Sequence, residues 1–159
     1  MNADDVLKYG NLTLLGTLDG LPFEAWNTPG VCGIWSVKDI IAHLASFEHM
    51  LVDVLNSVMN DHPTPTLDQY RQGGQVFNDQ EVTTRQSRSA QEVLDEYEQV
   101  QAQTMALIAQ IPVEKRRENG ILPWYGAEYD LEDYIAYSFY GHKREHSAQV
   151  AVYRDLIKS

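Results

Sequence analysis

Four long stretches of this sequence carry apolar residues at helical spacing, and this pattern limits the possible folds more than any other feature. The stretches span about 3–19, 37–60, 90–111 and 131 to nearly 159. No segment longer than a few residues alternates between apolar and polar residues as a half-buried strand does. We therefore predict an all-α fold. Four amphipathic helices bury their apolar faces most simply as a four-helix bundle.

Capping residues mark where three of these helices begin. Ser36 followed by Asp39, and Ser89 followed by Glu92, have the spacing of a capping box. Asp130 is the expected cap of the last helix, because a side-chain oxygen at this position accepts from a free backbone N–H. These residues place the starts of the second, third and last helices.

Helix breakers mark where the second and third helices end. Pro63 and Pro65 cannot continue the second helix beyond about residue 60, and Pro112 closes the third. The polar stretch 66–88 has a weak periodic pattern, so we expect a long, partly helical crossover there. Residues 113–129 are rich in glycine, proline and aromatic residues and are predicted to form a loop.

Length and charge exclude several classes of protein. A chain of 159 residues predicts a single domain over 1–159. Its 12 basic and 23 acidic residues give a net charge of −11, which would repel nucleic acid. No apolar run approaches the roughly 20 residues that span a bilayer, and residues 1–5 lack the pattern of a signal peptide. We therefore expect a cytoplasmic protein with no nucleic-acid or membrane partner.

The apolar face of the last helix is interrupted by polar residues at its centre. His142 and His146 lie one turn apart on this face, so both imidazoles could bind the same ion. In a regular helix the inward row, taken in steps of four and three, is Leu131, Ile135, Ser138, His142, then Glu145 or His146, Gln149, Tyr153 and Leu156.

The second helix has a matching interruption, because His43 lies on an apolar face between Ile40 and Phe47. Each of the three histidines could instead be a core residue hydrogen-bonded to a neighbour. Three desolvated imidazoles would each need such a partner, so their joint occurrence favours metal binding. Three neutral nitrogen donors suit Zn, Ni or Fe and leave coordination positions open.

The other two histidines are expected at the surface. His49 lies about 240° around the second helix from His43, and His62 falls in the proline-rich turn. The lone Cys32 cannot form an internal disulfide, and nothing in its sequence context indicates a reactive thiol.

Further polar and aromatic residues could complete the site. Glu48 and Glu145 are candidates for a fourth ligand or a partner of a ligand, unless they form solvated salt bridges. Gln149 could orient an imidazole or a water molecule, or fill space between helices. Four aromatic residues either form the walls of a pocket over the metal or plug the end of the bundle; they are Trp35, Trp124, Tyr125 and Tyr129.

Two segments resemble the signature elements of DinB/YfiT-like proteins. Residues 33–45, GIWSVKDIIAHLA, are similar to the family's G-x-W-[ST]-x-x-[DE]-x-x-x-H-[LI] element near the start of the second helix. Residues 140–149, YGHKREHSAQ, are similar to its H-x-x-x-H-x-x-Q element in the last helix. The helical outline between the two elements also agrees over nearly the full chain.

This resemblance implies a bundle of up-down-down-up topology, with the long crossover between the second and third helices, that is often a homodimer. It places the family's three-histidine metal site on His43, His142 and His146. Characterised relatives include S-transferases and isomerases that use mycothiol, bacillithiol or glutathione, and hydrolases that remove reactive toxins. A divalent metal and a low-molecular-weight thiol are therefore the implied cofactors.

We hypothesise a metal-dependent thiol S-transferase or hydrolase that acts on a small electrophilic substrate. A bound ion would lower the pKa of a thiol or water, so that the nucleophile exists near neutral pH. No catalytic residue beyond the ligands can be assigned from the sequence. The alternatives are a non-catalytic small-molecule-binding or stress-response module, and a metal-free helical protein that acts through its surface.

Overall fold

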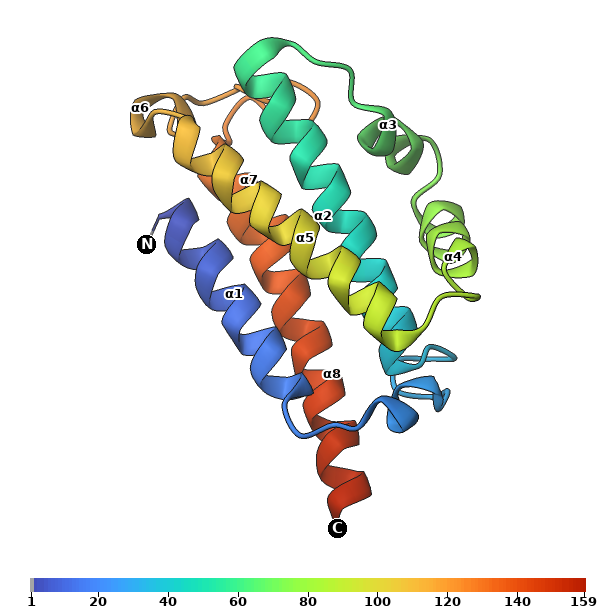
Figure 1. Cartoon of the computed structure of the whole chain (residues 1–159). Coiled ribbons are helices and arrows are strands. Elements are labelled where there is room, and N and C mark those ends of the chain that lie inside the picture. Colours follow the sequence, from blue (N-terminus) through green and yellow to red (C-terminus); the bar gives the residue numbers. More distant parts are fainter. Residues whose placement is uncertain (1) are drawn as a thin grey trace.

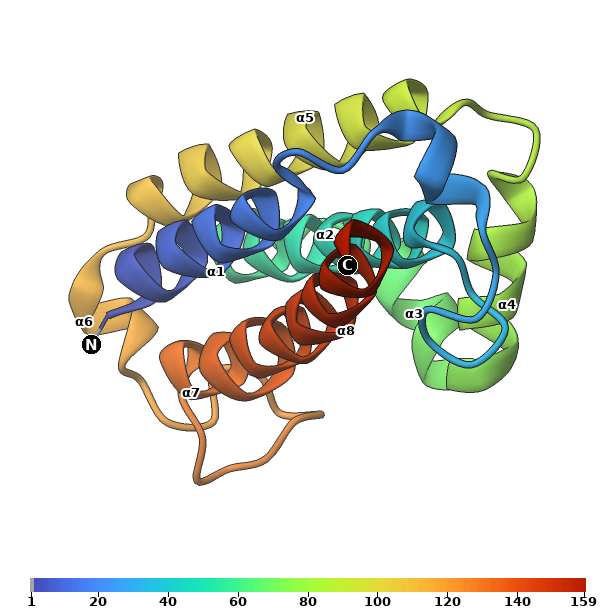
Figure 2. The ribbon, with the colours of Figure 1, turned by 90° about the horizontal axis from the view of Figure 1, so that it is seen from below.

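Four long helical segments pack side by side in the computed structural model, which describes residues 2–159 (Figures 1 and 2). They are α1 (Ala3–Leu18), α2 (Val37–Asn60), α5 (Ala90–Gln110) and a continuous run made of α7 (Leu131–Ile135), η2 (Ala136–Tyr140) and α8 (Gly141–Lys158). Across the described residues the only β-type pairing is an isolated bridge between Cys32 and Trp35. The all-α prediction is confirmed.

The order of the helices leaves α2 and α5 parallel. In Figure 1, α1 and the α7–η2–α8 run descend, whereas α2 and α5 ascend. The connection between α2 and α5 returns along the outside of α2 as two short helices, α3 (Pro65–Gln72) and α4 (Gly74–Thr84). α2 packs mainly on α5 and α1 mainly on α8, while α2 and α8 make few backbone contacts.

The local signals in the sequence account for the helix ends. The capping boxes at Ser36, Ser89 and Asp130 all form. α2 spans the predicted residues, and Asp61 ends it in the left-handed conformation. A short 3-10 helix, η1 (Phe23–Asn27), lies between α1 and α2, and a short helix, α6 (Val113–Arg116), lies in the stretch 113–129 that is predicted to form a loop.

The last helix is not regular, which corrects the predicted inward row. Over η2 the backbone is a π-helix, in which the Gly141 N–H donates to the Ala136 carbonyl five residues earlier. The extra residue per turn moves the buried face onto a new set of positions. Leu156, predicted to be in the core, is 67% exposed. The buried residues of this run are Leu131, Glu132, Tyr134, Ile135, Phe139, Lys143, His146, Ser147 and Val150.

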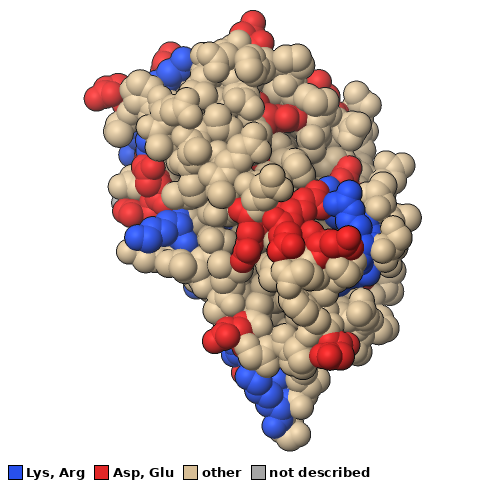
Figure 3. Space-filling view, in the orientation of Figure 1, with Lys and Arg blue, Asp and Glu red and all other residues tan. Residues whose placement is uncertain are grey.

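Two apolar clusters fill the bundle, and the His43 ring lies between Trp35, which packs on one of them, and Phe47, which belongs to the other. One contains Phe47, Leu51 and Phe139, and the other contains Ile40 and Tyr97. Acidic side chains gather on the surface over the first half of α5 (Figure 3). Among residues 2–159 no helix is long and apolar enough to cross a membrane.

Candidate metal centre

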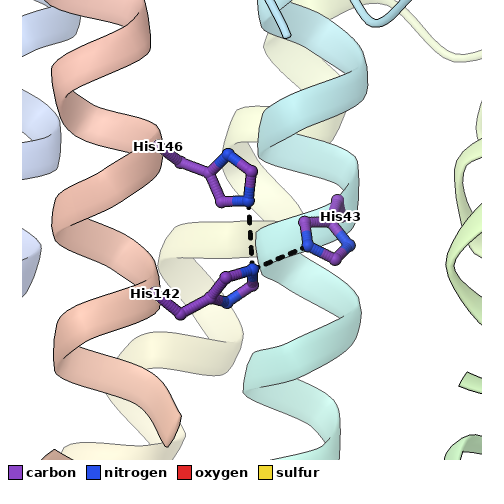
Figure 4. Close-up of side chains that lie close together, drawn as sticks. All are labelled: His43, His142 and His146. Carbon is purple, nitrogen blue, oxygen red and sulfur yellow. Dashed lines mark hydrogen bonds between the residues drawn. The ribbon is translucent and has the colours of Figure 1, made fainter. Parts of the chain in front are cut away.

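The three predicted histidines converge between α2 and α8 (Figure 4). His43 comes from the second turn of α2, and His142 and His146 come from successive turns of α8. The His142 Nε2 atom lies 2.9 Å from His43 Nε2 and 3.0 Å from His146 Nε2. Donor atoms of the three rings all lie within 4.8 Å of one another. The structure thus brings together three residues that are up to 103 positions apart in the sequence.

The protonation states of the three imidazoles favour a bound metal ion over a network of hydrogen bonds among the rings. An imidazole nitrogen carries either one hydrogen or one lone pair, so His142 Nε2 cannot make a good hydrogen bond to both neighbouring nitrogens. Burial, together with the neighbouring imidazoles, lowers the pKa of His43 to about 2. Burial, His146 and Lys143 lower that of His142 to about 4. The rings are therefore neutral at physiological pH, the form that binds a metal.

Neighbouring side chains fix the orientation of two of these rings. The His146 Nδ1–H donates to Gln149 Oε1 at 2.8 Å, which leaves the lone pair on Nε2, facing the other histidines. Gln149 therefore orients an imidazole, which is one of the roles predicted for it. The His43 ring is held by packing instead, with the Trp35 and Phe47 ring centres 4.8 and 4.7 Å away.

A pocket of about 400 Å³ opens beside the histidines. His43 and His142 form part of its lining, and α2, the crossover helices, the 117–130 loop and the α7–η2 segment contribute the rest. Trp124 and Tyr125 line it, as predicted for aromatic walls. Tyr129 does not line it but packs against Tyr125, with ring centres 5.1 Å apart.

Neither carboxylate proposed as a fourth ligand faces the three histidines. Glu145 is exposed. Glu48 is buried and accepts from Lys143 Nζ at 2.5 Å and from Thr104 Oγ1 at 3.0 Å. Burial alone would lower the pKa of Lys143, but the Glu48 carboxylate and Tyr97 outweigh burial and hold this pKa above its usual value. The sequence gives no signal for this buried ion pair.

The remaining histidines and the cysteine lie outside the site. His49 faces α5 and bonds to Glu96 Oε1 at 3.1 Å, with 41% of its side chain exposed. His49 therefore lies at the surface as predicted, but it is hydrogen-bonded to a carboxylate and only partly exposed. His62 is exposed, and Cys32 is a half-buried free thiol.

Comparison with known proteins identifies the family. Residues 13–132 match the mycothiol maleylpyruvate isomerase N-terminal domain, so the match includes His43 and ends before His142 and His146. No curated protein and no solved structure matches the chain. The match supports the DinB superfamily but does not single out its DinB/YfiT-like members. The chain belongs to the mycothiol maleylpyruvate isomerase N-terminal domain family, whose helical domain is of the DinB type.

Proposed function

We propose that this protein is a metal-dependent enzyme that adds a low-molecular-weight thiol, or water, to a small electrophilic substrate. One observation carries the proposal: three neutral imidazoles converge beside a pocket of about 400 Å³ that can admit a small molecule. The mycothiol in the name of the matching family favours the thiol as nucleophile.

The donor set determines which chemistry the site would support. His43, His142 and His146 would hold a divalent ion such as Zn, Ni or Fe without cancelling its charge, because all three ligands are neutral. Such an ion, when bound, lowers the pKa of a thiol or water and polarises the electrophile. Gln149 keeps the lone pair of His146 directed at the site.

The pocket wall would position the electrophile. Phe47 and Met50 give the pocket lining an apolar surface next to His43. Trp124 and Tyr125, from the loop before α7, add two aromatic side chains to this lining. A substrate held between these side chains displaces water and approaches the histidines from one side. The same geometry also suits a module that captures a small molecule without turnover.

Turnover by reconstituted protein distinguishes these possibilities. Untagged protein loaded with zinc should accelerate the reaction of glutathione or mycothiol with chlorodinitrobenzene. The His142→Ala variant should lose at least about 100-fold of this activity, because it lacks a ligand. His62→Ala is the matched control, since it removes an exposed histidine outside the site, and it should retain full activity.

The thiol dependence separates transferase from hydrolase. A product that forms only with added thiol supports transfer, and a product that also forms without thiol supports hydrolysis. Zinc-loaded protein that binds the electrophile with no product would contradict the proposal and favour the binding module. Equal turnover by wild type and His142→Ala would also contradict it.

A further inference from the structure

The outer part of the pocket carries a cation without a partner. Arg71, in the last turn of α3, lines the pocket, and its guanidinium carbon lies 5.4 Å from the centre of the Trp124 ring. Within residues 2–159 this guanidinium makes no ion pair and no hydrogen bond, whereas Arg85, Arg88, Arg116, Arg117 and Arg154 each pair with a carboxylate. Arg71 is therefore free to bind a ligand.

The lining contains no carboxylate that could neutralise Arg71. None of the twelve residues around the pocket is Asp or Glu, although the chain has 23 acidic and only 12 basic residues. Acidic side chains gather instead over α5 (Figure 3). A positive group placed in a pocket free of acidic residues, on a protein of net charge −11, favours an anionic ligand.

The uncharged polar groups of the pocket add hydrogen-bond donors. Tyr70, Tyr125 and Tyr134 line it, and their hydroxyl groups make no hydrogen bond to any described residue. The ring centres of Tyr125 and Tyr134 lie 4.8 Å apart, so two of these phenols are neighbours in the pocket lining. The buried Oδ1 of Asn78 also lacks a partner in the described chain, but it is an acceptor and would bind a donor of the ligand or a water rather than the anionic group. The three phenols thus offer the ligand hydrogen-bond donors that the protein itself does not use.

From this geometry we infer that the pocket binds a small organic oxyanion, with its anionic group at Arg71 and its apolar body between Phe47, Leu67 and Trp124. The inference rests on the proposed function, because it names the substrate class of the same pocket. The planar fork of a guanidinium pairs with two oxygens of a carboxylate or phosphonate at once. His43 and His142 line the same pocket, so the rest of the ligand would lie within reach of the proposed metal centre.

Binding of three probes of similar shape tests the inference. Benzoate, phenylphosphonate and neutral benzamide are titrated into wild-type protein by calorimetry, in zinc-loaded and metal-stripped forms. Benzoate or phenylphosphonate should bind at least about 10-fold more tightly than benzamide in both forms, because hydrogen bonds between charged groups are stronger than those to a neutral amide. Comparison of the two anions shows which oxyanion the pocket prefers.

Substitution of Arg71 tests whether its guanidinium causes the preference for anionic over neutral probes. Arg71→Met should bind the anions no better than benzamide, while its zinc content and helicity stay unchanged. Arg71→Lys should retain part of the preference, since it keeps the charge but loses the fork. Arg144→Met is the matched control, because Arg144 is also exposed and lies over an aromatic ring, at 5.6 Å from the centre of Tyr140, outside the pocket.

Three results would overturn the inference: no measurable anion binding, equal affinity for benzoate and benzamide, or an anion preference that survives in Arg71→Met. If Arg71→Met still prefers anions over benzamide, and this preference disappears when zinc is removed, the anion binds to the metal rather than to Arg71. An Arg71-dependent preference in a protein that binds no metal would contradict the proposed function alone.

Discussion

Lys143 follows His142 directly in the sequence, yet its ammonium group lies in the core. It donates to Glu48 and lies 5.2 Å from the centre of the Tyr97 ring. Glu48 in turn accepts from Thr104, so α8, α2 and α5 are joined through one carboxylate. This ion pair and the histidines are two separate polar connections between α2 and α8. Because both charges are buried, each depends on the other to remain ionised.

We predict that Lys143→Met lowers the free energy of unfolding by about 3–5 kcal/mol, because the Glu48 charge is left buried and unpaired. The double variant Glu48→Leu/Lys143→Met should recover most of this loss, since it removes both charges. Urea unfolding of the wild type and both variants measures the difference. A double variant as unstable as the single one would show that the loss comes from packing rather than from charge.

Glu96 makes the stability depend on pH. Burial alone would raise its pKa, but the hydrogen bonds from His49 and Arg85 and the charges of Arg85 and Arg88 outweigh burial and lower the pKa to about 2. The folded protein therefore binds a proton at Glu96 less readily than the unfolded chain does. The stabilisation is complete above the unfolded pKa of about 4.5 and is lost as the pH falls toward 2.

Replacement of Glu96 by Gln should remove this dependence. We predict that the wild type loses more free energy of unfolding than Glu96→Gln between pH 5 and pH 3. Chemical unfolding at a series of pH values measures both slopes. Parallel slopes would show that Glu96 is not stabilised by its three neighbours.

At the scale of helices, the π segment η2 sets which side chains of α8 face α2. It ends directly before Gly141, and His142 follows, so the extra residue adjusts the register where the ligand candidates begin. Tyr137, inside the segment, is 65% exposed. π-turns often occur at functional sites, and here the segment also brings Ser138 to the pocket lining.

Insertion of one alanine after Gly141 should turn His142 and His146 away from His43 by about 100°. We expect zinc affinity to fall at least about 10-fold, because two ligands are displaced together. Deletion of Tyr137 is the control, since it removes the extra residue of the π segment, leaves a regular helix and keeps the orientation of the two histidines. Calorimetry measures the affinity and circular dichroism the helix content. Unchanged zinc affinity after the insertion, or an equal loss after the deletion, would show that the π segment does not set the register of the site.

Local signals in the sequence are enough to place individual helices. The capping box at Ser36 and the prolines at 63 and 65 define α2, and the interrupted apolar face of α2 identifies His43. The π segment could not be predicted in the same way, because residues 131–142 fit a regular helix equally well in steps of four and three. Only packing against the rest of the bundle selects the register.

Residues defined by distant partners could not be predicted either. Lys143 is expected at a surface, and its burial depends on Glu48, which is 95 positions away. Arg71 lies in the crossover, whose weak polar pattern gives no hint that it lines the same pocket as His142. The sequence thus identifies the three histidines, whereas the surroundings that tune them require the fold.

At the scale of the whole molecule, the site joins two helices that otherwise touch little. α2 and α8 share few backbone contacts, yet His43 and His142, 99 residues apart, meet at 2.9 Å. An ion bound there would connect segments from both halves of the chain. The unfolded chain has no such preformed site, so the binding free energy adds to stability.

We predict that zinc raises the unfolding temperature of the wild type. At a free zinc concentration about 100-fold above Kd the stabilisation is about 2.7 kcal/mol. His43→Ala should show little or no zinc-dependent shift, whereas His62→Ala should behave as the wild type. Scanning calorimetry with and without zinc measures the shift. An equal shift in His43→Ala would place the zinc elsewhere.

The metal content of untagged protein tests the central claim most directly, namely that three imidazoles from α2 and α8 hold one ion. Elemental analysis after zinc loading and gel filtration should find roughly one zinc per chain in the wild type and in His62→Ala. His43→Ala, His142→Ala and His146→Ala should each retain far less. A wild type without stoichiometric metal, or ligand variants with unchanged content, would contradict the account.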